Sequence, residues 1–104
     1  MSFGTYLSTR RKILGISQKD LADRLLKDDG SSISAQYLND IEHDRRNPPT
    51  EDIINQLADQ LQVPSEYLLF LAGEIPRDLR LTQATPESIT AAFSAFRKAI
   101  RNPK

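Results

Sequence analysis

Hydrophobic side chains recur three or four residues apart in successive segments of this chain, and this spacing predicts an all-α fold. The first helix is expected over residues 3–14, with Ser2 as its cap and Gly15 as its stop. Three cations at residues 10–12 lie in its last turns, where they suit the negative end of the helix dipole. The apolar positions of this helix are Phe3, Tyr6, Leu7, Ile13 and Leu14.

A second helix is expected from Ser17 to about Lys27. Ser17 is followed three residues later by Asp20, which is close to a capping box, although Asp replaces the usual Glu or Gln. Gly30 and its polar neighbours then break the helix. Its inward positions are Leu21, Ala22 and Leu25.

A third helix begins at Ser34, and its inward side would carry Tyr37, Leu38 and Ile41. A short helix that is braced by another, with amide groups near its start, is what the reading of base edges in a major groove requires. We therefore interpret this segment as a DNA-reading helix. Its outward side chains are Ala35, Gln36, Asn39, Asp40 and His43.

Two further helices are expected after a link that two prolines close. Thr50 caps the first of them, while Pro64 and Ser65 start the second, which stops at Gly73. Their apolar stripes indicate a hydrophobic core rather than a ligand site. The stripes consist of Ile53, Ile54, Leu57, Ala58 and Leu61 in the first helix and Tyr67, Leu68, Phe70 and Leu71 in the second.

A last helix is expected from Thr85, because a capping residue, a proline and an acid come together there. Residues 75–81 before it are interpreted as a connecting segment. Two interpretations of the last helix stay open: it packs on its own bundle, or it forms the seam of a dimer. The seam residues would be Ile89, Phe93, Phe96 and Ile100.

The composition is that of one compact globular unit, with 104 residues, 38 % of them hydrophobic and 27 % charged. The chain contains no cysteine, which removes disulfides and thiolate metal sites and suits a reducing cytoplasm. No apolar run reaches membrane-spanning length, and the first residues lack the plan of a signal peptide. We therefore expect a cytoplasmic protein that does not enter a membrane.

The net charge is zero, with 14 Lys and Arg residues against 14 Asp and Glu, whereas nucleic-acid binders more often carry a basic excess. Bases and acids are interleaved around the reading helix: Arg45 and Arg46 follow it, and Asp40, Glu42 and Asp44 lie in it or beside it. We expect weak non-specific affinity for DNA, with a modest dependence on salt.

The sequence contains little that indicates an enzyme active site. His43 is the only histidine, and no serine in a recognised nucleophile context lies around it. Neither metal-ligand spacing nor a glycine-rich phosphate loop is present. We therefore expect no enzyme, no metal site and no cofactor, and interpret His43 as an exposed helix-end residue or a phosphate contact.

A set of motif positions occurs in register: Ser17, Gln18, Leu21, Ala22, Ser34, Tyr37, Leu38, Ile41, Glu42 and residues 45–48. In these positions the chain resembles the helix-turn-helix of the Cro and phage-repressor type, the XRE family, over about residues 3–72. The resemblance implies a five-helix DNA-binding bundle, here with an additional C-terminal helix. We expect a DNA-binding domain at 1–73, and a connecting segment and candidate dimerisation helix at 74–104. The turn between Leu25 and Ile33 is several residues longer than the tight turn usual in the family.

The resemblance also implies a structural ion pair, in which Arg11 holds Glu42 and so ties the first helix to the reading helix. Gln18 would brace the reading helix and help to fix the phosphate backbone, although it can also be read as an exposed polar residue. The loop after the reading helix would lie along the DNA backbone. The candidate backbone contacts are Ser17, Gln18, His43, Arg45 and Arg46.

The positions that match the family's base readers are Ala35, Gln36, Asn39 and Asp40. Gln36 can bond an adenine through its amide, and Ala35 can touch a thymine methyl group. Asp40 can accept only from an amino group such as that of cytosine. The alternative is that Asp40 faces solvent or pairs with Arg45.

Two functions follow from these patterns. The first is a sequence-specific transcriptional regulator, a homodimeric repressor that binds an inverted repeat in double-stranded DNA. Its signal would come through a regulatory partner protein, proteolysis or concentration. The second is an antitoxin-like protein-binding module that neutralises a partner through its C-terminal segment, which the zero net charge and the acids of the reading helix favour.

Overall fold

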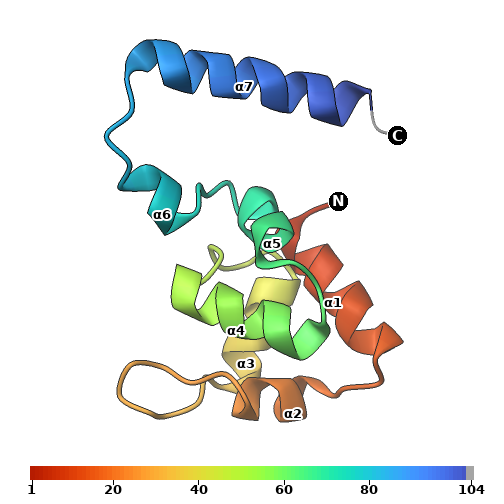
Figure 1. The fold of residues 1–104 in the computed structure, drawn as a ribbon. Helices are drawn as coiled ribbons and strands as arrows, with labels where there is room; N and C mark the ends of the chain where they lie inside the picture. Colours follow the sequence, from red (N-terminus) through yellow and green to blue (C-terminus); the bar gives the residue numbers. More distant parts are fainter. Residues whose placement is uncertain (103–104) are drawn as a thin grey trace.

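The computed structural model describes residues 1–102, and seven helices and no strand occur among them (Figure 1). The expectation of an all-α fold is confirmed. The first five helices form a bundle, and two more follow it along the chain. The helices are α1 (Phe3–Ile13), α2 (Gln18–Asp23), α3 (Ala35–Glu42), α4 (Glu51–Leu61), α5 (Ser65–Leu71), α6 (Arg77–Arg80) and α7 (Pro86–Arg101).

Five of the helices begin at the hydroxyl residue that the sequence predicts. In each case the side-chain oxygen accepts a hydrogen bond from the backbone N–H three residues further on, which satisfies a group that the helix itself leaves unpaired. The capping residues are Ser2, Ser17, Ser34, Thr50 and Thr85.

The first five helices together enclose the core, which is almost entirely aliphatic. Three predicted core positions are wrong: Ile13 is 67 % exposed, Tyr67 is 41 % exposed and Phe70 is 54 % exposed. In α1 the buried Arg11 takes an inward position, and in α5 the inward position belongs to Leu69. The largest fully buried side chains are Leu7, Leu21, Leu25, Leu38, Ile41, Ile54, Leu57, Leu61 and Leu68.

The predicted end of the second helix is wrong: α2 ends at Asp23 rather than near Lys27. Leu25 and Ile33 are both buried, and the N–H of Ile33 donates to the carbonyl of Leu25 at 3.0 Å. The intervening residues form a hairpin-like loop, closed by a bridge between Leu26 and Ser32.

A side chain of α4 pins this loop to the bundle. The backbone N–H of Leu26 donates to Gln56 Oε1 at 2.7 Å, and Gln56 Nε2 donates to the carbonyl of Leu26 at 2.9 Å. Gln56 thus fixes Leu26, and the bridge from Leu26 to Ser32 holds the other end of the loop. The additional residues extend outward, as the loop below α4 in Figure 1 shows. Loop length alone costs little when the ends are held, so the long turn is compatible with normal helix packing.

The segment interpreted as a plain connection contains α6, which is held at the start of α4. Glu51 accepts from the backbone N–H of Arg77 at 3.2 Å and from the guanidinium of Arg80 at 3.3 Å. Beyond it, α7 lies at the end of the molecule opposite α2 (Figure 1), and none of its residues is buried. Its nearest aromatic neighbour is Phe70 of α5, whose ring centroid lies 5.9 Å from that of Phe96.

The start of α1 meets the end of α3 so closely that only glycine fits. A Cβ atom at Gly4 would lie 2.7 Å from the carbonyl oxygen of Glu42 and would also overlap that of Ile41. Asp44, in the left-handed region at φ 57°, closes this contact. Its carboxylate accepts from the hydroxyl of Ser2 at 2.7 Å and from the N–H of Gly4 at 3.2 Å.

We expect Gly4→Ala to lower the free energy of unfolding by roughly 1–3 kcal/mol, because the added methyl group must push backbone apart. Alanine is otherwise the better helix former, so helix propensity acts against this loss. Thr9→Ala, at an exposed position of the same helix, is the matched control and should change stability by less than about 0.5 kcal/mol. Urea unfolding measures both, and equal stability of the two variants would contradict the close contact.

Candidate nucleic-acid interface

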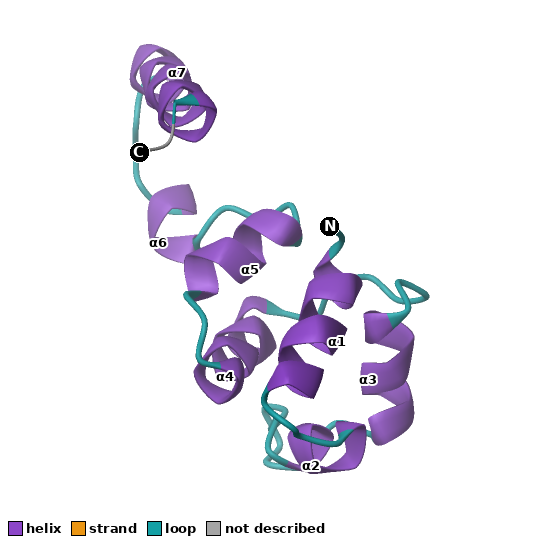
Figure 2. Cartoon of the chain, turned by 90° about the vertical axis from the view of Figure 1, so that its right-hand side faces the viewer, coloured by secondary structure: helices purple, strands orange, loops and turns teal. Residues whose placement is uncertain are grey.

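One side of α3 carries no other helix. In Figure 2, α1 lies along one side of α3 and α2 crosses near its start, while the opposite side is open. Leu38 and Ile41 point inward and are buried. We define the reading face as the five residues on the open side, of which Gln36 and His43 are exposed and the others are half-buried: Ala35, Gln36, Asn39, Asp40 and His43.

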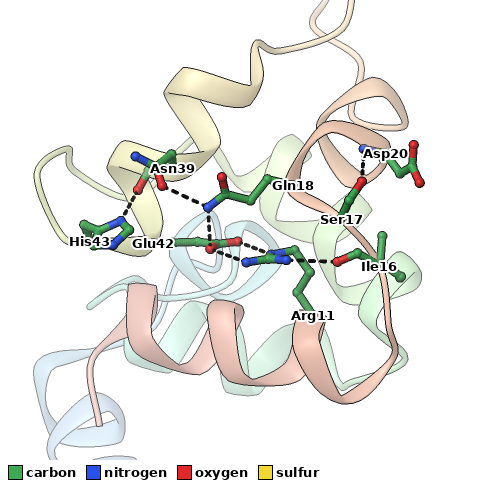
Figure 3. Close-up of polar contacts among 8 residues, drawn as sticks. All are labelled: Arg11, Ile16, Ser17, Gln18, Asp20, Asn39, Glu42 and His43. Atoms are coloured by element: carbon green, nitrogen blue, oxygen red, sulfur yellow. Dashed lines mark hydrogen bonds and ion pairs between the residues drawn. The ribbon is translucent and has the colours of Figure 1, made fainter.

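A buried ion pair joins α1 to the end of α3. Arg11 Nε lies 2.7 Å from Glu42 Oε2, and Arg11 Nη2 lies 2.9 Å from Glu42 Oε1 (Figure 3). Arg11 is 8 % exposed and Glu42 is 5 % exposed. The third contact of the guanidinium is the carbonyl of Ile16, at 2.9 Å. The two side chains implied by the resemblance thus form a bidentate pair in which the buried charges are matched.

Gln18 connects this ion pair to the reading face. Its Nε2 donates to Glu42 Oε1 at 2.9 Å and to Asn39 Oδ1 at 3.0 Å (Figure 3). Both amide protons of Gln18 are therefore used inside the protein. The contacts also determine the orientation of Asn39: its oxygen faces Gln18, so its Nδ2 group points toward the open side.

His43 caps the end of α3 rather than extending freely from it. Its Nδ1 lies 2.8 Å from the carbonyl oxygen of Asn39 (Figure 3). A carbonyl can only accept, so Nδ1 carries the proton and Nε2 is the ring nitrogen left for solvent or a ligand.

Asp40 pairs with Arg45, one of the alternatives that the sequence leaves open. Asp40 Oδ1 accepts from Arg45 Nε at 3.2 Å, from Arg45 Nη2 at 3.0 Å and from Gln36 Nε2 at 3.0 Å. The hydrogen bonds from Arg45 hold the pKa of the Asp40 carboxyl below its ordinary value of 3.8, and the amide of Gln36 acts in the same direction. The acid at the centre of the reading face is thus matched by a neighbouring base.

The remaining cations near α3 and α1 have distinct environments. Arg46 lies over the ring of Tyr37, with its guanidinium carbon 5.5 Å from the ring centroid, in a cation–π contact. Arg10 Nε donates to the carbonyl of Leu61 at 3.0 Å and so caps the end of α4. Of the three cations at residues 10–12, only Lys12 matches the simple picture of a solvated helix end.

Sequence reasoning missed Gly4 and Asp44, which fix the end of α3 against α1, and the role of Arg10 as a cap of α4. An acid placed just after a helix and a hydroxyl at the start of another were the available signals for the Asp44 contact. Over residues 1–102 no cluster of side chains suits a metal ion, and no helix is long and apolar enough to cross a membrane.

Removing one partner of the Arg11–Glu42 pair should destabilise the fold by about 3–5 kcal/mol, because the other charge is left buried alone. We expect this loss for Glu42→Leu. The double variant Arg11→Met, Glu42→Leu should be more stable than Glu42→Leu alone, since no uncompensated charge remains. Urea unfolding measures the free energy of unfolding of Arg11→Met, Glu42→Leu and the double variant. A double variant that loses the sum of the two single losses would contradict the buried pair.

The carboxyl of Asp40 should titrate below pH 3.8, and in Arg45→Gln its midpoint should rise toward that value. A carboxyl whose pKa is lowered by folding stabilises the protein above its unfolded pKa, and this contribution is lost as the pH falls through the folded pKa. NMR titration of the side-chain carboxyl measures both midpoints. An unchanged midpoint in Arg45→Gln would show that Arg45 does not set the titration.

Comparison with known proteins gives two findings. A family model described as helix-turn-helix matches residues 7–68. Curated proteins from two strains of Mycobacterium tuberculosis, each called an uncharacterized HTH-type transcriptional regulator, are 31 % identical to the chain over 70 residues. The match covers 67 % of this chain and 45 % of each relative, so the chain spans less than half the length of these proteins. No solved structure matches the chain.

Proposed function

The chain belongs to the XRE-type helix-turn-helix family, and we propose that it binds double-stranded DNA as a sequence-specific transcriptional regulator. The finer parts of the proposal are that it represses transcription, acts in the cytoplasm and binds an inverted repeat as a homodimer. The observation that carries the proposal is the open side of α3 (Figure 2), on which Asn39 is oriented by a hydrogen bond from Gln18 of α2 and Asp40 is paired with Arg45.

Asn39 is the best-positioned base reader. Gln18 occupies one lone pair of its oxygen, so the Nδ2 group of Asn39 is the donor that it offers on the outward side. Acceptors on the major-groove edge are O6 and N7 of guanine, O4 of thymine and N7 of adenine. We therefore propose that Asn39 contacts one of these atoms through Nδ2.

Ala35, Gln36 and Asp40 complete the proposed reading face. Gln36 has two amide protons, so one can stay on Asp40 while the other and the side-chain oxygen bond an adenine, and Arg45 keeps the carboxylate matched. Asp40 acts in this scheme mainly by positioning Gln36 and Arg45. Ala35, at the first turn, is small enough to approach a thymine methyl group.

The proposed phosphate contacts lie on both sides of the reading face. Arg46 is the main one, because its charge is not paired with a carboxylate among the described residues. Arg45 and Ser17 are at the periphery, and His43 can donate through Nε2 only when its ring is protonated. Gln18 supports the interface through Asn39, since both of its amide protons are already bonded.

Two variants separate base reading from phosphate binding. Gln36→Ala should relax sequence preference, with a loss of about 1–3 kcal/mol on the preferred DNA and little loss on random DNA. Arg46→Ala should weaken binding evenly on all sequences. It should also lower the slope of log affinity against log salt concentration by about one released counterion. Fluorescence anisotropy on both DNAs measures these effects. Equal losses of the two variants on specific and random DNA would reject the division.

An antitoxin-like protein-binding function is the second candidate, which the uncovered apolar side chains of α7 and the zero net charge favour. Gel shift with genomic fragments at two salt concentrations distinguishes the two. Retention of particular fragments at the higher salt supports the regulator. A co-purifying second protein, with no retained DNA at either salt, supports the protein-binding function and contradicts the regulator.

A further inference from the structure

A set of uncovered apolar side chains lies along α7. Ile89, Phe93, Phe96 and Ile100 are between 44 % and 52 % exposed, although Phe96 already contacts Phe70. The bundle of the same chain therefore leaves about half of each side chain in water. Exposed aromatic and branched side chains in one stripe are typical of a protein interface.

The spacing of these four residues is that of a two-helix seam. They follow one another at intervals of four, three and four residues, which is the pattern of apolar seam positions in a coiled coil. The small Ala92 and Ala99 flank the stripe and allow another helix to approach closely.

The stripe reads the same from both ends. Isoleucine, phenylalanine, phenylalanine and isoleucine occur at intervals that are symmetric about the point between Ser94 and Ala95. When two copies run in opposite directions about a twofold axis through this point, Ile89 faces the partner's Ile100 and Phe93 faces the partner's Phe96. An isologous contact of this kind needs the same patch on both copies to be self-complementary, and this stripe has that property.

The charges of α7 favour the same direction. Its acid, Glu87, lies in the first turn, and its bases, Arg97, Lys98 and Arg101, lie toward the end. Opposed helices bring Glu87 near the partner's Arg101 and align the helix dipoles favourably. A parallel pair would instead gather the six bases of the two copies at one end.

We propose that a second copy of this chain covers the stripe, with the two α7 helices antiparallel and the twofold axis between Ser94 and Ala95. This pairing specifies how the homodimer of the proposed function forms, and it rests on that proposal for its biological role. Glu51, at the start of α4, is bonded to Arg77 and Arg80 of α6. Because α7 follows α6 along the chain, this contact limits where α7 can lie relative to the bundle.

Sedimentation equilibrium of the whole chain without DNA tests the association. The wild-type chain should be a dimer at micromolar concentration, and Phe93→Lys should weaken dimerisation at least tenfold. Ser94→Lys, which adds the same charge one residue away and off the stripe, should leave it unchanged. A wild-type chain that stays monomeric, or equal effects of the two folded variants, would overturn the proposal.

Cross-linking tests the direction, because the natural chain has no cysteine. A mixture of Ile89→Cys and Ile100→Cys chains should be joined by a short bismaleimide. Neither variant should cross-link alone, since its two thiols would lie about 17 Å apart along the helix axes. Cross-linking of each variant alone would show a parallel pair, and no cross-linking in a dimeric mixture would likewise overturn the antiparallel seam.

The same samples keep this inference separate from DNA binding. An antiparallel dimer that binds no DNA supports the seam and rejects the proposed regulator. A chain that binds DNA with sequence preference, yet stays monomeric on and off the DNA, supports the regulator and overturns the seam.

Discussion

The buried ion pair between Arg11 and Glu42 is the constraint on which the rest of the site depends. Two charges 2.7 Å apart and almost out of water can persist only if their remaining hydrogen-bonding atoms are also matched. Ile16 supplies one such partner and Gln18 supplies another, and no buried side-chain nitrogen or oxygen is left unpaired over residues 1–102. The need to satisfy this pair therefore fixes where α1, the start of α2 and the end of α3 lie relative to one another.

The reading face is therefore positioned by contacts with residues beneath it. Gln18 is held by its hydrogen bond to Glu42, and its second hydrogen bond orients the side chain of Asn39. Asp40 forms an ion pair with Arg45. A chain with no net charge can still approach a phosphate backbone if the acids near its reading helix are already paired. The neutral composition and the DNA-binding fold are compatible for this reason.

Hydrophobic periodicity, capping residues and proline were enough to predict six of the seven helices and the starts of all six, because these signals are local in sequence. The features that escaped prediction depend on residues far apart in the chain. The inward position of Arg11 breaks the hydrophobic pattern, and only the family resemblance implied its pairing with Glu42. Gly4 is needed only because α3 ends against α1. The loop that follows the early end of α2 is held by Gln56, about thirty residues away, which bonds the backbone of Leu26. The base-reading assignments are still predictions.

The most direct test of the organising role of this network is a double-mutant cycle in DNA binding between Gln18 and Asn39. Affinity is measured for the wild-type chain, Gln18→Ala, Asn39→Ala and the double variant, on the sequence that the wild type selects from a random pool. If Gln18 acts through Asn39, the double variant should bind about as weakly as Asn39→Ala alone, with a coupling energy of about 0.5–3 kcal/mol. Losses that simply add would contradict this role, because Gln18 and Asn39 would then contribute to DNA binding independently.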